Sequence, residues 1–290
     1  MSNVFFDLTR SDKGFNYRWV QPPQVTYLVS TVDRWGNHNI TPVTLGTCVG
    51  ANSLPNPQDS NYYYAFSVGS ADVPDIPARD AFHNLEAVPE CVISYPGAEL
   101  MEQIWATALP IPAGIEEMQV AGLTPLPSRM VRPAGVAECP INMEARVESS
   151  YAVGEHYRLY ICQILGVSVD QGLLATDKGN PLHYGMMSIA PLFEVTIARE
   201  ENLPPRLYFG QIDTEHLTRT PDDMGPSNKW VGSFADWIED EARRGKIGEQ
   251  ERQEILRLYD VWQSDPDPAE NGEVKAALTG YLRQIVWDRR

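Results

Sequence analysis

The sequence predicts a mainly β protein whose C-terminal region is helical. Nineteen of the 23 prolines lie before residue 210. There, short runs rich in β-branched and aromatic residues alternate with turn residues, as in a sandwich or barrel. From Ser227 onward the apolar residues recur instead with the 3.6-residue period of an amphipathic helix. With 290 residues, 43% of them hydrophobic, the chain is long enough to bury a substantial core.

Seven segments are predicted as strands. The first two, residues 25–32 and 38–43, flank the stretch 33–37, in which Gly36 and Asn37 suit a tight hairpin turn. The other predicted strands are residues 62–68, 90–94, 141–150, 156–169 and 192–197. Their number and spacing favour an all-β barrel or sandwich over a helical bundle.

Two helices are expected between these strands. Residues 77–80 open the first, with a carboxylate near the positive end of the helix dipole, and Pro89 ends it. Its apolar side carries Phe82, Leu85 and Val88. The second spans residues 97–108, where apolar residues four apart share one helical face.

Three amphipathic helices are expected in the C-terminal region. Ser233 is the predicted cap of the first, residues 249–263 form the second, and Asn271 is the predicted cap of the third. We therefore divide the chain into a β domain, residues 1–212, and a helical C-terminal extension, residues 213–290, with residues 220–226 as a linker.

Charge narrows the function classes. Lys and Arg number 23 against 39 Asp and Glu, which gives a net charge of −16. Duplex nucleic acid and anionic membranes are repelled by such a field, so we expect neither as a partner. The longest weakly polar stretch, residues 104–115, contains two prolines and is shorter than the ~20 residues of a membrane helix. The start of the chain lacks the pattern of a secretory signal, and we expect a cytoplasmic protein.

Generic catalytic motifs are missing from the sequence. It contains no G-x-S-x-G, no H-E-x-x-H, no G-x-G-x-x-G and no P-loop, so a serine hydrolase, a zinc protease and a nucleotide-binding domain are not supported. We expect the five histidines to be structural or exposed, and no metal site. The four cysteines, widely spaced among apolar neighbours, are interpreted as buried thiols.

Two longer stretches resemble one known family. Residues 31–44, T-V-D-R-W-G-N-H-N-I-T-P-V-T, resemble the hairpin motif of the flavin reductase-like, FMN-binding split-barrel family, which includes flavoredoxins. Residues 118–147, M-Q-V-A-G-L-T-P-L-P-S-R-M-V-R-P-A-G-V-A-E-C-P-I-N-M-E-A-R-V, resemble a second motif of that family. The resemblance covers roughly residues 20–200, and the helical region has no counterpart in the minimal family.

The resemblance implies a fold and a function. The fold is a Greek-key split β-barrel, usually a homodimer, that holds FMN in a cleft near the subunit boundary. The expected function is hydride transfer, in which the flavin carries the redox chemistry and the protein orients it. NAD(P)H is the expected hydride donor, and free flavin, a small molecule or a partner oxygenase the expected acceptor.

The resemblance also implies cofactor-binding residues on the second strand and after it. Asn39, Thr41, Pro42 and Thr44 occupy the strand that in this family runs beside the flavin ring and ribityl chain, and Thr47 is a further candidate. The family often has Ala where this chain has Thr41. The alternative for the threonines is ordinary β-propensity.

A third set of matching residues would bind the phosphate. Residues 79–85 align with the helix opening of the family, which makes Arg79, Asp80 and Ala81 candidates for the FMN phosphate site. A helix N-terminus and a neighbouring guanidinium both favour a phosphate. Ala81 replaces a Thr of the family and removes one hydroxyl donor. The alternative is a capped surface helix with Arg79 in solvent.

Other functions stay open. Some family members carry G-D-H where residues 166–172 of this chain have no His, which puts the reaction with NAD(P)H in question. One alternative is a flavin-binding electron carrier without direct NAD(P)H reaction, and another is an FMN enzyme acting on its own organic substrate.

The helical extension holds four of the seven tryptophans, at positions 230, 237, 262 and 287. Such large apolar side chains require burial. We expect them either to pack on the barrel or across a dimer, or to wall the flavin cleft.

Overall fold

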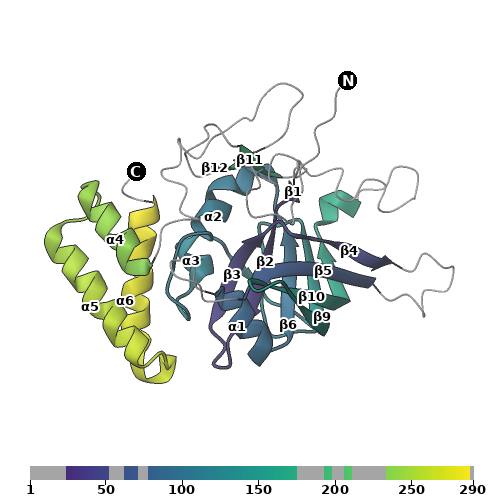
Figure 1. Ribbon diagram of the computed structural model, residues 1–290, viewed down its shortest axis with the longest axis horizontal. Helices are drawn as coiled ribbons and strands as arrows, with labels where there is room; N and C mark the ends of the chain where they lie inside the picture. Colours follow the sequence, from purple (N-terminus) through teal and green to yellow (C-terminus); the bar gives the residue numbers. More distant parts are fainter. Residues whose placement is uncertain are drawn as a thin grey trace.

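The computed structural model describes residues 24–51, 62–70, 78–174, 193–197, 206–210 and 233–287. A β-rich part and a block of C-terminal helices lie side by side (Figure 1). The prediction of a mainly β fold with a helical C-terminal extension is thereby confirmed. The predicted domain boundary at residue 212, the linker at 220–226 and Trp230 lie outside the described residues.

The main sheet has seven antiparallel strands in the order β3-β2-β6-β9-β10-β5-β4. The strands are β2 Tyr27–Val32, β3 His38–Val43, β4 Gly46–Ala51, β5 Tyr62–Gly69, β6 Glu90–Tyr95, β9 Ile141–Val153 and β10 Tyr157–Val169. The sheet curls so that β3, at one edge, also comes close to β5 near the other. Two smaller sheets consist of β1 Gln24–Val25, β11 Phe193–Ile197 and β12 Arg206–Gly210, and of β7 Pro125–Leu126 and β8 Gly135–Val136.

The predicted first hairpin is confirmed. Gly36 has φ +89°, and the Asp33 carboxylate accepts hydrogen bonds from the backbone N–H groups of Trp35 at 2.8 Å and Asn37 at 2.9 Å. The predicted strand 25–32 is interrupted at Thr26. Strand β4 was not predicted, because its glycines weaken the strand pattern.

The four cysteines differ in their burial. Cys91, Cys139 and Cys162 are buried, as expected, whereas Cys48 on β4 is exposed. The interpretation of Cys48 as a buried thiol is therefore wrong. The reason is its position on an edge strand, of which Thr47, Cys48 and Val49 are all exposed.

Among the described residues, five short helical segments lie between the strands: α1 Asp80–Ala87, the 3₁₀ turn Ala98–Leu100, α2 Met101–Ala106, α3 Glu117–Val120 and the 3₁₀ turn Gln171–Leu174. Helix α1 begins and ends as predicted. The helix expected over 97–108 is shorter: α2 ends at Ala106, and the N–H groups of Ala108 and Leu109 donate to carbonyls only three residues back, at 3.0 and 3.3 Å. Helix α3 was not predicted.

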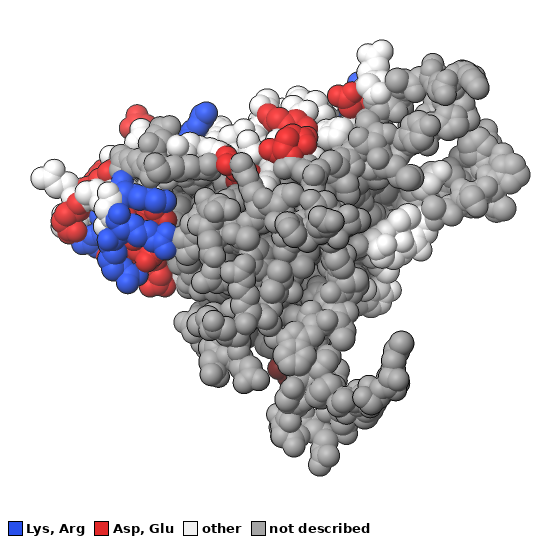
Figure 2. Space-filling view, turned by 90° about the horizontal axis from the view of Figure 1, so that it is seen from above, with Lys and Arg blue, Asp and Glu red and all other residues white. Residues whose placement is uncertain are grey.

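The C-terminal helices are α4 Phe234–Arg243, α5 Glu249–Ser264 and α6 Pro268–Trp287. Ser233 caps α4 in a reciprocal capping box with Asp236, as its sequence context predicts. None of the described helices combines the length and the apolar character needed to cross a membrane. Acidic and basic side chains lie next to one another at this end of the molecule (Figure 2).

The prediction that Asn271 caps the third of these helices is wrong. The helix begins at Pro268, and Asn271 lies at a kink inside it with φ −118° and ψ 29°. The residue that accepts a first-turn N–H is Asp267, whose carboxylate binds the N–H of Ala269 at 2.8 Å. Proline is well suited to the first helical position because it needs no N–H partner there.

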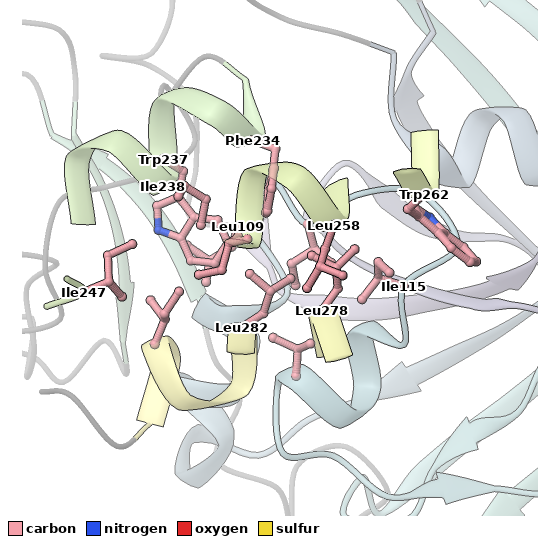
Figure 3. Close-up of a cluster of buried hydrophobic side chains, with 14 residues drawn as sticks. Leu109, Ile115, Phe234, Trp237, Ile238, Ile247, Leu258, Trp262, Leu278 and Leu282 are labelled. Carbon is pink, nitrogen blue, oxygen red and sulfur yellow. The ribbon is translucent and has the colours of Figure 1, made fainter. Parts of the chain in front are cut away.

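The C-terminal helices share one hydrophobic cluster with residues 109–120, the segment that ends in α3 (Figure 3). The segment contributes Leu109, Ile111, Ile115 and Val120, the turn between α4 and α5 contributes Ile247, and the helices contribute Phe234, Trp237, Ile238, Ile255, Leu258, Trp262, Leu278, Leu282 and Ile285. Trp262 donates from Nε1 to the carbonyl of Ala113 at 2.7 Å, and Trp287 donates to that of Val120 at 2.7 Å. For Trp237, Trp262 and Trp287 the structure therefore shows packing on the segment before β7.

A glycine allows one of these contacts. Gly114 has φ +79°, and a Cβ at this position would lie 2.9 Å from Cζ2 of Trp262. Gly114→Ala is therefore expected to destabilise the protein by about 2–4 kcal/mol, since the strain of a positive φ adds to the clash. Chemical denaturation monitored by tryptophan fluorescence measures this change.

Gly245→Ala is the matched control, because Gly245 has φ +74° with no atom within 4 Å of the added Cβ. It should show the backbone strain alone. Equal losses in the two variants would contradict a role for the Trp262 contact.

Candidate functional site

A buried polar network lies where β3 meets α1 and α3. Asn39, on β3, is 6% exposed. Its Oδ1 accepts hydrogen bonds from the hydroxyls of Thr41 at 3.1 Å and Thr31 at 3.3 Å. Asn84 of α1 donates from Nδ2 to the Thr31 hydroxyl at 3.1 Å. The predicted residues Asn39 and Thr41 are thus joined through side chains to β2 and α1.

The centre of this network is a residue that was not predicted, Glu117 of α3. Its Oε2 accepts from Asn39 Nδ2 at 2.7 Å and from the backbone N–H of Ile40 at 2.6 Å. The side chain is 5% exposed. One carboxylate therefore fixes both the side chain of Asn39 and the backbone of β3.

The start of α1 has a geometry that suits an anion. Arg79 is the N-cap residue, and among the described residues no side chain caps the helix. The first N–H groups of such a helix are available to a ligand, and the helix dipole favours a negative charge there. The Arg79 N–H donates to the carbonyl of Gly69 at 3.1 Å and joins the helix start to β5. Within the described part of the chain, the Arg79 guanidinium forms no ion pair.

Two carboxyl groups share this junction. Burial raises the pKa of Glu117 well above its ordinary value, the nearby Asp80 carboxylate raises it further, and the bonds from Ile40 and Asn39 oppose the shift. Burial also raises the pKa of Asp80 to about 6, although His83 and Arg79 oppose it. The Arg79 charge opposes the rise in pKa of both carboxyl groups. The three residues therefore interact electrostatically.

The other predicted residues lie in different surroundings. The Ala81 side chain is fully buried in the barrel core, beside Val29 and Leu85. Thr47 is exposed on β4, with its hydroxyl 3.5 Å from the carbonyl of Cys48. Pro42 pairs with Leu28 across the hairpin, and Thr44 is buried just beyond β3. The structure therefore brings Asn39, Thr41, Arg79 and Asp80 together, while Thr47 lies on the opposite edge strand.

The sequence carried one signal for Glu117. It lies between Ile115 and Met118, both fully or almost fully buried, and a carboxylate within a buried apolar run requires hydrogen-bond partners. Because α3 is only four residues long, helical periodicity could not reveal it.

Residues 23–189 match the family model of the flavin reductase like domain. Among curated proteins, the chain is similar to YdfE of Bacillus subtilis strain 168, with 29% identity over 181 residues, 55% of this chain and 79% of that protein.

Solved structures give the fold. Component B of nitrilotriacetate monooxygenase from Bacillus cereus matches with a TM-score of 0.57 and 19% identity, covering 74% of this chain and 98% of that one. A flavin reductase with a split barrel domain from Shewanella frigidimarina matches with a TM-score of 0.51 and 16% identity, covering 76% and 99%. The split-barrel fold expected from the sequence is thus confirmed.

Two substitutions at Glu117 separate its charge from its hydrogen bonds. Glu117→Gln keeps an oxygen that accepts from Asn39 and Ile40, whereas Glu117→Leu leaves both buried donors without a partner. The Leu variant is expected to be less stable than the Gln variant by about 2–4 kcal/mol, because each unpaired buried polar group costs about 1–3 kcal/mol. Urea unfolding at pH 7 measures the difference, and equal stabilities would contradict the bonding role of Glu117.

Comparison of Glu117→Gln with the wild type also tests the pH dependence of stability. Since the pKa of Glu117 is higher in the folded protein than its ordinary value of 4.5, the folded state binds the proton more tightly. Stability from this group is complete below about pH 4.5 and falls as the pH rises through the folded-state pKa. Glu117→Gln should therefore gain stability relative to the wild type between pH 5 and pH 8, as followed by unfolding at each pH. A constant difference across this range would contradict the raised pKa.

Proposed function

Because the chain belongs to the flavin reductase like family, we propose that it is an FMN-dependent oxidoreductase that transfers a hydride from NAD(P)H through flavin to free flavin, a small acceptor or a partner protein. Flavin-linked redox chemistry is the common ground of the family. FMN as the cofactor and NAD(P)H as the donor are the finer parts of the proposal.

The observation that carries the choice of FMN is the uncapped start of α1 beside Arg79. A phosphate there would receive backbone N–H groups and a guanidinium, the two kinds of donor that phosphate esters prefer. Helix α1 also lies beside β3, where the polar side chains of Asn39 and Thr41 are hydrogen-bonded to each other. The residues present therefore fit a phosphorylated flavin.

In this proposal five residues have a defined part. Arg79 and the first N–H groups of α1 bind the phosphate. Asn39 is oriented by Glu117 and keeps β3 in place, and the Thr41 hydroxyl donates to Oδ1 of Asn39. Ala81 contributes only its backbone, because its side chain belongs to the core. FMN, when bound, supplies the hydride-accepting ring that no side chain can replace.

A second candidate is an electron carrier that does not react with NAD(P)H. Residues 166–172 contain no His. In the structure a tight turn comes directly after β10, closed by the Asp170 carboxylate, which accepts the N–H of Gly172 at 2.6 Å. This turn presents no imidazole to a nicotinamide.

We also propose a homodimer, which the resemblance implies. Exposed apolar side chains on β4, β5 and the loop before β4, namely Leu45, Val49 and Tyr62, support it, because an edge strand with such side chains is suited to association. Sedimentation equilibrium tests the assembly: a monomer at micromolar concentration would contradict it.

Arg79→Ala is expected to weaken FMN binding by about 10- to 100-fold, because a hydrogen bond to a charged group contributes about 1.5–3 kcal/mol. Flavin fluorescence titration measures the dissociation constant. Arg243→Ala is the control, because Arg243 is an exposed residue on α4, paired with Asp240. Equal FMN affinity in Arg79→Ala and the wild type would contradict a phosphate site at α1.

Anaerobic mixing of the FMN-loaded protein with NADH or NADPH tests the donor. Loss of the oxidised flavin absorbance within the mixing experiment is the expected result. An oxidised spectrum that persists with both nucleotides, but is reduced by dithionite, would favour the electron carrier. A protein that remains colourless in excess FMN would contradict the whole proposal.

A further inference from the structure

The C-terminal helices bind the segment that carries Glu117 at three places. Two are the tryptophan indoles of α5 and α6, which donate to the carbonyls of Ala113 and Val120. The third is an ion pair between Lys275 of α6 and Glu116, the residue next to Glu117. Because α3 spans only residues 117–120, contacts at 113, 116 and 120 bracket the whole helix.

Lys275 also contacts the hairpin that leads into β3. Its Nζ donates to Oδ1 of Asn37 at 2.7 Å, and Asn37 in turn donates from Nδ2 to the Asp33 carboxylate at 2.7 Å. The Lys275 side chain is only 13% exposed and that of Glu116 23%, so water screens this ion pair much less than a surface pair. One ammonium group thus joins α6, the hairpin turn and the start of α3.

This link differs from the other ion pairs of the extension. Among the described residues, the pairs made by Arg243, Arg244, Lys246, Arg252 and Arg257 all remain within the C-terminal helices and the turn between α4 and α5. Lys275 pairs with a residue more than 150 positions earlier in the chain. Its ammonium therefore joins α6 to the β domain.

The two residues that Lys275 binds are close in sequence to the two sides of the contact made by Glu117. Asn37 precedes Asn39 by two residues, and Glu116 precedes Glu117 by one. Glu117 binds Asn39 and Ile40 at 2.7 and 2.6 Å. Lys275 on one side and Glu117 on the other therefore fix the same short stretch of the hairpin against α3, and loss of the ammonium frees one side.

Charge also favours a cation here. Asp33, Glu116, Glu117 and Asp80 all lie around this junction, in a chain with net charge −16. Without Lys275, Glu116 would face the neighbouring acids unpaired, and like charges at short range repel.

We propose that Lys275 is a positioning residue for the flavin site: it binds Asn37 and Glu116 and so holds β3 and α3 in the arrangement in which Glu117 fixes Asn39 and Ile40. This inference rests on the proposed FMN function, because it assigns to that site a contribution from the C-terminal extension. Lys275 does not touch the cofactor in this role and acts through Asn39.

Lys275→Met tests the proposal, because Met keeps an apolar stem and removes the ammonium. Lys246→Met is the matched control: Lys246 pairs with the buried Glu241 at 3.0 Å inside the C-terminal helices, so the variant loses a comparable ion pair without touching the hairpin. Lys275→Arg is the conservative variant.

The readouts are the FMN dissociation constant, measured well below the melting temperatures of all variants, and the hydrogen exchange of residues 37–41 without flavin. Lys275→Met should bind FMN about 5- to 30-fold more weakly, which is the size of coupling that residues remote from a ligand usually show. Exchange at 37–41 should accelerate. Lys246→Met should lose stability but keep its FMN affinity within about 2-fold of the wild type, and Lys275→Arg should recover most of the affinity.

The outcomes separate the two levels of inference. FMN affinity and hairpin exchange unchanged in Lys275→Met would overturn the positioning role while the FMN site stands. An equal loss of affinity in Lys246→Met would also overturn it, since general destabilisation would then explain both variants. A wild-type protein that takes up no FMN would overturn the proposed function itself.

Discussion

The arrangement of the candidate site depends on one buried carboxylate, that of Glu117. Strand β3 lies at the edge of the seven-stranded sheet, and an edge strand presents backbone groups that no neighbouring strand pairs. Glu117 accepts one of these groups, the N–H of Ile40, together with the Asn39 amide. A helix of four residues thus covers the edge with an acceptor where a further strand would otherwise be needed. The local conformation of β3 therefore depends on α3.

This solution has an electrostatic cost, which the surrounding residues reduce. A carboxylate removed from water is unfavourable unless it is hydrogen-bonded and paired. The neighbouring Asp80 adds repulsion, which raises the pKa of Glu117 beyond the effect of burial. The Arg79 charge at the start of α1 offsets part of it, and Lys275 neutralises the adjacent Glu116 by an ion pair. Arg79 is also the residue proposed to bind the phosphate. A phosphate bound there would add negative charge near both carboxyl groups, so in the proposed site cofactor binding and the charge balance of the junction are coupled.

The sequence was sufficient for much of the fold and for part of the site. Runs of β-branched and aromatic residues separated by turn residues located β2, β3, β5, β6, β9 and β10. Strand β4 was missed because two of its six residues are Gly, and Asn271 was mistaken for a cap because Asp267 and Pro268 already start the helix. Glu117 could not be singled out among 39 acidic residues, because its role depends on a contact with Asn39, 78 positions away. Long-range pairing of this kind leaves no periodic signal.

The C-terminal helices are part of the folded core and not an appendage to the barrel. They cover Leu109, Ile111, Ile115 and Val120, which are residues of the same segment that holds Glu117. Removal of the helices would expose this apolar set, and each fully buried aliphatic side chain contributes about 1.5–3 kcal/mol by its burial. A truncated protein would therefore lose α3, and with it the fixed conformation of β3, whether or not the helices approach the cofactor. For this reason a loss of flavin after truncation would not identify a lid, and single substitutions at the contacts between helices and barrel are the informative changes.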